Sequence, residues 1–166
     1  MRVLVAVASK HGATREVAEA IGEILDDHGI QTEVVAAADV ASVDGYDGVV
    51  IGSAVYAGRW LDAARTLVEE AEDCLHDRPV WLFSSGPIGT PPKPEEEPVD
   101  VADMLERSGA REHRVFAGKL DRSRLGFAEK AIVVALRAPE GDFRDWDAIR
   151  AWAAEIAAAV GASEPA

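Results

Sequence analysis

Continuous apolar runs alternate along the chain with stretches in which apolar residues recur every three or four positions. The runs cover residues 2–8, 32–37, 48–53, 79–85 and 113–120, and their length and composition predict five β-strands. The first run contains VLVAVA, which has no polar face, so we expect this strand to be buried on both sides of a sheet.

Amphipathic patterns lie between and after these strands. Apolar residues at steps of three and four predict helices over residues 13–28, 60–75 and 146–160, and a shorter helix over 99–108. Asp145 precedes the last helix and suits an N-cap, because its carboxylate can accept a hydrogen bond from an amide of the first turn.

The alternation of strands and helices predicts an α/β fold. Strands joined through helices form a parallel sheet with helices on both faces and right-handed crossovers. Five strands within about 120 residues favour a doubly wound five-stranded sheet of order 2-1-3-4-5 over a longer dinucleotide-binding fold, and 166 residues suit a single domain, 1–166. Ligands of such sheets bind at the carboxyl ends of the strands, so the loops after the first, third and fourth strands are the candidates.

Three segments depart from this regular pattern. GPIGTPPKPEEEPVD, residues 86–100, is rich in Pro and Glu and predicts an extended, solvated loop. Residues 125–137 are apolar on nearly every side and predict an inserted helix that packs against the body or a second copy rather than on a membrane. Residues 161–166 are expected to form a disordered tail.

Charge and composition narrow the choice of function. Acids outnumber bases by 30 to 17, which argues against a nucleic-acid-binding surface and allows docking to basic protein partners. Cys74 is the only cysteine, so an intramolecular disulfide is excluded and a core position is expected; the four histidines are scattered and predict no metal site. No apolar run approaches the roughly 20 residues of a transmembrane helix, and the first run is too short for a secretory signal, so a cytoplasmic protein is expected.

The turn SKHGAT, residues 9–14, stands between the first strand and the first helix. Amides at a helix start lack intrahelical partners and lie at the positive end of the helix dipole, which together make an anion site. Gly12 permits a tight turn and a close approach to a phosphate, while Ser9 and Thr14 add hydroxyl donors. Lys10 and Arg15 add positive charge nearby. The alternative is that Ser and Thr only cap the helix.

The residues of this loop do not match the motifs of other loops found at this position in similar folds. A dinucleotide fold requires three glycines here and a Walker loop requires Gly-Lys, whereas this loop has one glycine. A phosphatase of this topology would carry a cysteine in the loop, and a phospho-acceptor domain would carry acids after the first and third strands. Here those two strands end in AS and GS.

Two further loops follow the third and fourth strands. GSAVYAGRW, residues 52–60, combines small residues with Tyr56 and Trp60, which offer flat surfaces for a stacked ring, although Trp60 fits a core anchor better. SSGPIG, residues 84–89, is small, polar and rich in glycine. Taken together, three such loops predict a phosphate pocket beside a slot for a planar ring.

These three motifs resemble those of the flavodoxin family. SKHGAT matches its [ST]-x-x-G-x-T phosphate loop, and GSAVYAG and SSGPIG match its two ring-binding loops. Within the family the chain is similar to the flavodoxin-domain subgroup that includes menaquinone-dependent protoporphyrinogen oxidase, through GSAVYAGRW, RPVWLFSSGPIG and FAGKLDRSRLGFAEKAIVV…GDFRDWDAI. The resemblance implies a flavodoxin-like fold and bound flavin mononucleotide, FMN.

Carried over residue by residue, the resemblance implies a phosphate subsite and two walls for the flavin ring. The phosphate residues are Ser9, Lys10, His11, Gly12, Ala13 and Thr14; one wall is Ala54, Val55, Tyr56, Ala57 and Gly58, and the other is Ser85, Gly86, Pro87 and Ile88. The peptide of Ala57–Gly58 is then the one expected to flip and accept a hydrogen bond from N5 of reduced flavin.

The expected function is electron transfer through bound FMN, with no catalytic side chain. An alternative is a protoporphyrinogen oxidase-like dehydrogenase that uses a quinone, although the segment RAPEGDFRD, residues 137–145, is shorter and less basic than in many members of that subgroup. A second alternative is a cofactor-free binding module of the same fold. The corresponding partners are redox proteins, or a quinone and a porphyrinogen, and a homodimer is an open option.

Overall fold

A computed structural model of the chain describes residues 1–10, 12–56, 59–85, 101–116, 119–120, 141–142 and 144–162. Its centre is a parallel sheet of β1 (Arg2–Ala8), β2 (Gln31–Ala36), β3 (Gly48–Tyr56), β5 (Val80–Ser85) and β6 (Glu112–Phe116). The strands are arranged in the order β2-β1-β3-β5-β6, and each neighbouring pair is parallel. This is the predicted order 2-1-3-4-5, so the flavodoxin-like fold class is confirmed.

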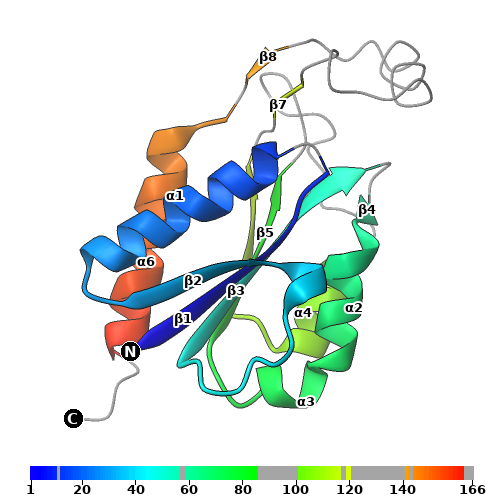
Figure 1. Ribbon diagram of the computed structural model, residues 1–166, viewed down its shortest axis with the longest axis vertical. Coiled ribbons are helices and arrows are strands. Elements are labelled where there is room, and N and C mark those ends of the chain that lie inside the picture. Colours follow the sequence, from blue (N-terminus) through cyan, green and yellow to red (C-terminus); the bar gives the residue numbers. More distant parts are fainter. Residues whose placement is uncertain are drawn as a thin grey trace.

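Helices cover both faces of the sheet (Figure 1). On one face lie α1 (Ala13–Asp27) and α6 (Trp146–Ala162), which pack against each other. On the other lie α2 (Asp62–Glu70), α3 (Glu72–Leu75) and α4 (Val101–Ser108), with the short helix η1 (Ala37–Asp39) after β2. The result is the three-layer arrangement that alternating strands and helices predict.

The core consists of two apolar clusters, one on each side of the sheet, and β1 contributes to both. Val3, Val5 and Val7 pack with α1 and α6, and Leu4, Ala6 and Ala8 pack with α2 and α4. All six are at most 5% exposed. Successive side chains of a strand point to opposite faces, so this continuous apolar run is buried on both sides, as expected.

The predicted helix 60–75 is interrupted, and its start was wrong. β3 extends beyond residue 53 to Tyr56, and β4 (Arg59–Trp60) returns antiparallel to it. The helix therefore starts only at Asp62, as α2, and breaks at Ala71, whose φ of −100° and ψ of 7° are not helical, before α3. Trp60 is 2% exposed, which agrees with its expected place in the core.

The C-terminal part follows the prediction with two differences. β6 stops at Phe116, and β7 (Lys119–Leu120) pairs antiparallel with β8 (Gly141–Asp142) instead of continuing the predicted strand. α6 extends to Ala162, two residues into the predicted tail. The rest of that tail, the loop 86–100 and the helix predicted over 125–137 lie outside the described residues.

Asp145 begins α6 as expected. Its Oδ1 accepts a hydrogen bond of 3.0 Å from the amide of Ala148, and its carbonyl accepts one from the amide of Ile149. The side chain therefore satisfies one of the amides that a helix start leaves without a partner.

A close contact between β3 and β5 depends on a glycine. A Cβ on Gly52 would lie 2.0 Å from Cζ of Phe83, so the aromatic ring occupies the space that any side chain at position 52 would need. The Phe83 ring also packs against Phe116 and Trp152, with ring centroids 6.2 and 6.1 Å away. Gly52 thus allows an aromatic cluster to form directly on the sheet.

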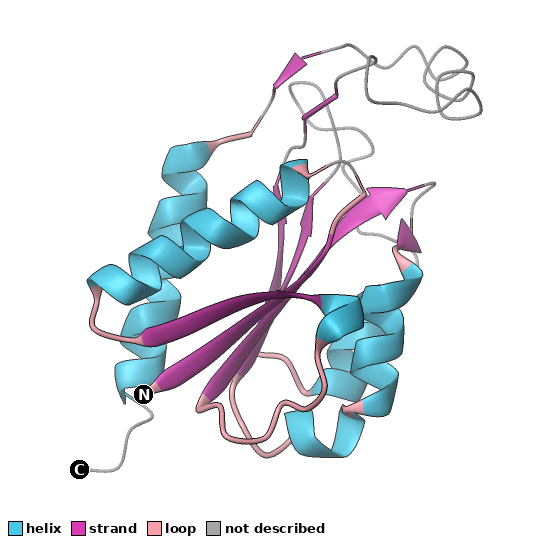
Figure 2. Ribbon diagram, viewed as in Figure 1, coloured by secondary structure: helices cyan, strands magenta, loops and turns pink. Residues whose placement is uncertain are grey.

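All five parallel strands point toward the same edge of the sheet. In Figure 2 the central strands β1, β3 and β5, from which the candidate loops leave, run toward the top of the molecule, where α1 also begins. This carboxyl edge is the place where ligands bind in open α/β sheets.

Candidate functional site

The loops singled out in the sequence start next to one another at the carboxyl edge. Ala8, the last residue of β1, is paired with Ser53 of β3. The next residue of β3, Ala54, is paired with Ser85, the last residue of β5. The sheet register therefore brings the starts of all three predicted binding loops together.

The first loop turns sharply at Gly12. Its φ of 89° lies in the left-handed region that favours glycine, and its amide donates a 3.1 Å hydrogen bond to Oγ of Ser9. Because Oγ of Ser9 accepts this bond, the Ser9 hydroxyl proton is free to point toward a ligand. The tight turn at Gly12 is as the sequence predicts, and the role of Ser9 toward a phosphate stays a prediction.

Gly12 is also the N-cap of α1, and no side chain caps the helix. The amides of the first helical turn, starting at Ala13, therefore remain available at the positive end of the helix dipole. Thr14 is 4% exposed, so it lies beneath the turn, whereas Lys10 is exposed. The structure does not support the alternative that Ser or Thr only caps the helix. Ser9 accepts a hydrogen bond from the amide of Gly12, which is the N-cap residue, and no side chain of the described residues caps the first helical turn.

Arg144, from the segment before α6, reaches this same turn. Its guanidinium donates a 3.3 Å hydrogen bond to the Ala13 carbonyl and forms a 3.1 Å ion pair with Glu16. Its side chain is 4% exposed, and the guanidinium carbon lies 4.6 Å from the ring centre of Trp146. Sequence reasoning missed Arg144. A lone Arg just before a helix cap was the only signal, and nothing in the pattern ties it to a loop 131 positions earlier.

The second loop leaves β3 through a hairpin. Val55 pairs with Trp60 and Tyr56 with Arg59, so the backbone reverses around positions 57–58. At the base of this hairpin, Oγ of Ser53 accepts a 2.9 Å hydrogen bond from the amide of Leu61 and donates one to the carbonyl of Ala54. The hydroxyl thus holds both ends of the hairpin together.

The third loop begins with an unsatisfied hydroxyl. Ser85 is 1% exposed, and its Oγ has no hydrogen-bond partner in the structure. A buried hydroxyl without a partner is costly, and in native proteins such groups usually have a functional explanation. A polar ring edge at the end of β5 would satisfy it.

A chain of polar groups ties the second and third loops together. The indole Nε1 of Trp60 donates a 2.7 Å hydrogen bond to Oγ of Ser84, which is 2.6 Å from Nε2 of His113 on β6. Ser84 is completely buried. The sequence indicated no role for His113, since serine and histidine lie 29 positions apart with no shared motif.

Several predicted site residues cannot be placed. His11, Ala57, Gly58 and the residues 86–88, Gly86 to Ile88, lie outside the described residues, and Tyr56 is described by its backbone alone. Their assignment to the phosphate and ring subsites stays a prediction. The described members Ser9, Lys10, Gly12, Ala13, Thr14, Ala54, Val55 and Ser85 are at the carboxyl edge or in the loop that leaves it.

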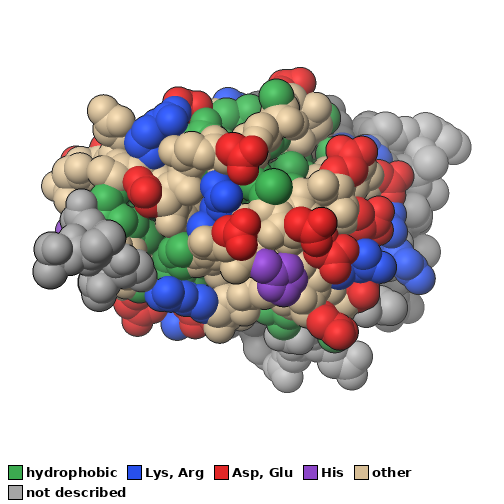
Figure 3. Space-filling model, turned by 90° about the horizontal axis from the view of Figure 1, so that it is seen from below, with side chains coloured by type: hydrophobic (Ala, Val, Ile, Leu, Met, Phe, Trp, Pro, Cys, Tyr) green, Lys and Arg blue, Asp and Glu red, His purple; other side chains and the backbone are tan. Residues whose placement is uncertain are grey.

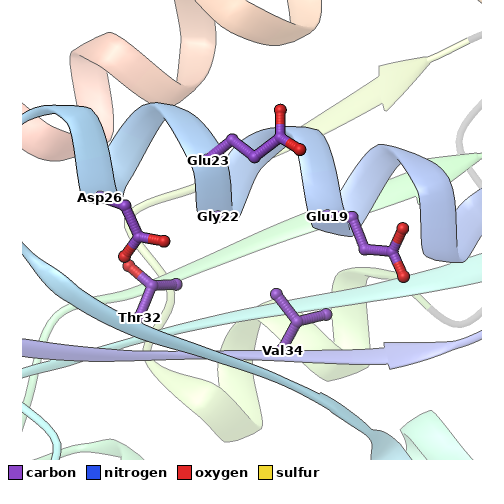
Figure 4. Close-up of a pocket in the computed structure, with 6 residues that line it drawn as sticks. All are labelled: Glu19, Gly22, Glu23, Asp26, Thr32 and Val34. Atoms are coloured by element: carbon purple, nitrogen blue, oxygen red, sulfur yellow. The ribbon is translucent and has the colours of Figure 1, made fainter.

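One surface groove elsewhere in the described part is unsuited to an anion. A surface groove of about 260 Å³ between α1 and β2 has a strongly acidic rim (Figure 4). It is lined by Glu19, Gly22, Glu23, Asp26, Thr32 and Val34. Three carboxylates repel a phosphate, and within the described residues no group of His, Cys, Asp and Glu could hold a metal ion.

Cys74 is only partly buried and packs at the margin of the core, so the expected core position holds only in part. The pKa of the Cys74 thiol is raised, chiefly by the negative charge of Asp44, so the reactive thiolate is disfavoured. The face opposite the carboxyl edge carries interspersed acidic and basic side chains and no continuous basic patch (Figure 3). Among the described helices, none has the length and apolar character needed to cross a bilayer.

The fold is a doubly wound α/β sheet, and three loops start side by side at its carboxyl edge, where such folds bind ligands. A family model described as flavodoxin domain matches residues 4–147. The chain therefore belongs to the flavodoxin family, and this membership supports the predicted FMN cofactor and an electron-transfer role.

One curated relative has an assigned activity. The protoporphyrinogen IX dehydrogenase (quinone) of Escherichia coli strain K12 is 26% identical over 178 residues, with 95% of each chain covered. This similarity agrees with the subgroup that the sequence motifs indicate.

Solved structures show the same fold. A flavodoxin from the domain Archaea matches with a TM-score of 0.66 and 16% identity, over 97% of this chain and 99% of that one. A flavodoxin of Streptococcus pneumonia TIGR4 matches with a TM-score of 0.64 and 19% identity, over 96% and 99%. At these identities the likeness establishes the fold.

Proposed function

We propose that this chain is an electron carrier that holds FMN at the carboxyl edge of its sheet. The phosphate lies on the turn of residues 9–14. The flavin ring lies between the segments 54–58 and 85–88. The cofactor, when bound, supplies the redox chemistry by accepting and releasing electrons, and the chain binds, orients and shields it.

The observation that carries this proposal is the pair of open polar groups at the edge. The glycine N-cap of α1 leaves the first-turn amides uncapped, which suits the phosphate of FMN. The buried, unpartnered hydroxyl of Ser85 suits a polar atom on the ring edge. The two features lie at the ends of β1 and β5, which flank β3 in the sheet, so one ligand with an anionic and a planar end can meet both.

Binding measurements with FMN and riboflavin test the proposal, since the two ligands differ only in the phosphate. Titration calorimetry of the cofactor-free chain should show FMN binding at least about tenfold tighter than riboflavin, because the helix N-terminus binds the phosphate. The purified protein should show the absorption of oxidised flavin. If FMN gives neither heat nor saturation, the chain is instead the cofactor-free binding module.

Two serine variants separate the subsites. Ser9→Ala should weaken FMN binding and leave riboflavin binding unchanged, because Ser9 belongs to the turn that is proposed to bind the phosphate. Ser85→Ala should weaken both ligands equally, because Ser85 serves the ring. The reverse pattern would contradict the assignment of the two loops. Ser85→Ala should not destabilise the cofactor-free chain, since the hydroxyl that it removes has no partner there.

A second candidate function is oxidation of protoporphyrinogen with a quinone as acceptor. It is favoured by the relative of Escherichia coli, whose whole length this chain matches at 26% identity. Addition of protoporphyrinogen and menaquinone to the flavin-loaded protein tests it through the fluorescence of the porphyrin formed. A rate equal to autoxidation would leave electron transfer between proteins as the function, with the acidic surface suited to basic redox partners.

The proposal also includes a cytoplasmic location and, through the apolar segment 125–137, a homodimer. Sedimentation of the flavin-loaded protein tests the second point. A monomer at all concentrations would contradict it.

A further inference from the structure

An acidic residue lies in the first turn of the helix whose N-terminus is the proposed phosphate site. Glu16 lies in the first turn of α1, and its amide bonds the carbonyl of Gly12. A carboxylate at this end of a helix favours the dipole but repels an anionic ligand. The chain already carries a net charge of −13, and the phosphate of FMN adds negative charge to it.

Arg144 meets this carboxylate directly. The ion pair between Arg144 and Glu16 spans 3.1 Å, while the Arg144 side chain is 4% exposed and that of Glu16 is 48% exposed. The same guanidinium nitrogen bonds the carbonyl of Ala13, the first residue of α1. Trp146 lies under the guanidinium at 4.6 Å, which favours a charged group on its ring face.

Burial gives this contact more weight than a surface ion pair has. An exposed pair contributes little because water screens both charges and the side chains stay free to move. Here one partner is almost fully enclosed and is fixed by three separate contacts, to Glu16, Ala13 and Trp146. The guanidinium therefore holds a fixed position beside the start of α1.

We infer that Arg144 is a positioning residue of the phosphate subsite: it neutralises Glu16 and fixes the first turn of α1, so that the turn keeps its affinity for a dianion. This inference rests on the proposed function, since it assigns the phosphate to the turn of residues 9–14. It adds to that turn a cation from a segment 131 positions away in the chain.

The test compares FMN and riboflavin affinities in variants of the full chain. Arg144→Gln removes the charge and keeps a polar, uncharged side chain. We expect FMN binding to weaken on the order of fivefold and riboflavin binding to stay the same. Glu16→Gln should leave FMN binding unchanged or tighten it. The double variant Glu16→Gln/Arg144→Gln should bind FMN as the wild type does, because neither charge remains.

Arg150→Gln is the matched control. Its guanidinium also lies near Trp146, at 6.0 Å from the ring centre, but pairs with Asp147 on α6. We expect no change in the preference for FMN over riboflavin. Circular dichroism of each variant confirms folding, and Glu16→Gln alters a half-exposed side chain, so it reports on the charge even if an Arg144 variant is unstable.

The outcomes separate the two proposals. If the wild type prefers FMN and Arg144→Gln keeps the full preference, the role of Arg144 is wrong while the phosphate subsite stands. The inference is also overturned if Glu16→Gln weakens FMN binding, or if the double variant binds as poorly as Arg144→Gln. If the wild type itself shows no preference for FMN, the proposed phosphate site fails before any variant is compared.

Discussion

Trp60 and Ser84 lie 24 positions apart in the chain, and the indole of Trp60 donates a hydrogen bond of 2.7 Å to the buried hydroxyl of Ser84. Trp60 closes the hairpin after β3, and Ser84 precedes the loop after β5. One side-chain bond thus fixes the distance between the two loops proposed to flank the flavin ring. His113 extends the contact to β6.

Removal of this hydroxyl should destabilise the fold. Ser84→Ala removes the hydroxyl that accepts the 2.7 Å hydrogen bond from the buried indole of Trp60, so we expect a loss of about 1–3 kcal/mol in the free energy of unfolding. Trp60→Phe removes the donor instead. In urea unfolding, the double variant should lose less than the sum of the single variants, with a coupling of about 1 kcal/mol.

Ser42→Ala is the control for this experiment. Ser42 is exposed and accepts only a local hydrogen bond from the amide of Asp44, so its loss should cost within about 0.5 kcal/mol. Strict additivity of the Ser84 and Trp60 variants would contradict the bond.

A side chain at Gly52 should disrupt the contact between β3 and β5. Gly52→Ala places a methyl group 2.0 Å from the ring of Phe83, so we expect a loss of at least about 2 kcal/mol in unfolding free energy. Gly161→Ala is the control, because a Cβ there meets no atom within 4 Å. Thermal unfolding should show a large fall for the first variant and none for the second. Equal melting temperatures would refute the steric argument.

Gly12 and Gly29 offer a matched pair for the anion turn. Both have a positive φ, 89° and 81°, so an alanine at either position costs about 1–2 kcal/mol in backbone strain. Only Gly12 belongs to the proposed site. Both variants should therefore unfold more easily, while Gly12→Ala alone should reduce the ratio of FMN to riboflavin affinity. A fall of that ratio in Gly29→Ala would show that general strain, rather than the turn, controls binding.

Acid should weaken the contact of β2 with the loop before β3. The pKa of Glu33 is held below its ordinary value of 4.5, first by the hydroxyl of Tyr46 at 2.6 Å and then by Arg2. A depressed pKa means that the contribution of Glu33 is complete above the unfolded value and is lost as pH falls through the folded one. The stability difference between the wild type and Glu33→Gln should therefore be complete above the unfolded-state pKa of 4.5 and shrink as pH falls below it.

Tyr46→Phe is the companion variant for the acid experiment. It removes the largest cause of the lowered pKa of Glu33, so the pH-dependent loss of stability should be smaller and should be complete at a higher pH. A difference between wild type and Glu33→Gln that stays constant across the whole range would contradict the assignment.

Much of the fold could be predicted because its signals are local. The apolar run 2–8 has no polar face, which specifies a buried strand, and the helical spacing in 13–28 identifies α1. The start of the helix at residue 60 was misplaced because Trp60 fits helical spacing as well as a short strand. Only its antiparallel pairing with Val55 and its bond to Ser84 decide between the two.

Only those parts of the candidate site that lie within one contiguous sequence motif could be predicted. Ser9 and Gly12 stand three residues apart, and their hydrogen bond follows from the turn itself. Arg144 and His113 approach the site from distant segments, and their contacts exist only after the chain has folded. Contacts between residues so far apart in the chain are not indicated by any periodic pattern in the sequence.

The strand made first, β1, lies between β2 and β3 in the sheet, and this order has a consequence during synthesis. Its two ladders need residues 31–36 and 48–53, so neither edge of β1 is complete when the first helix leaves the ribosome. Until then the turn after β1 lacks the two loops that lie beside it in the folded sheet. A site built from all three loops can therefore form only after β3 and β5 have been translated.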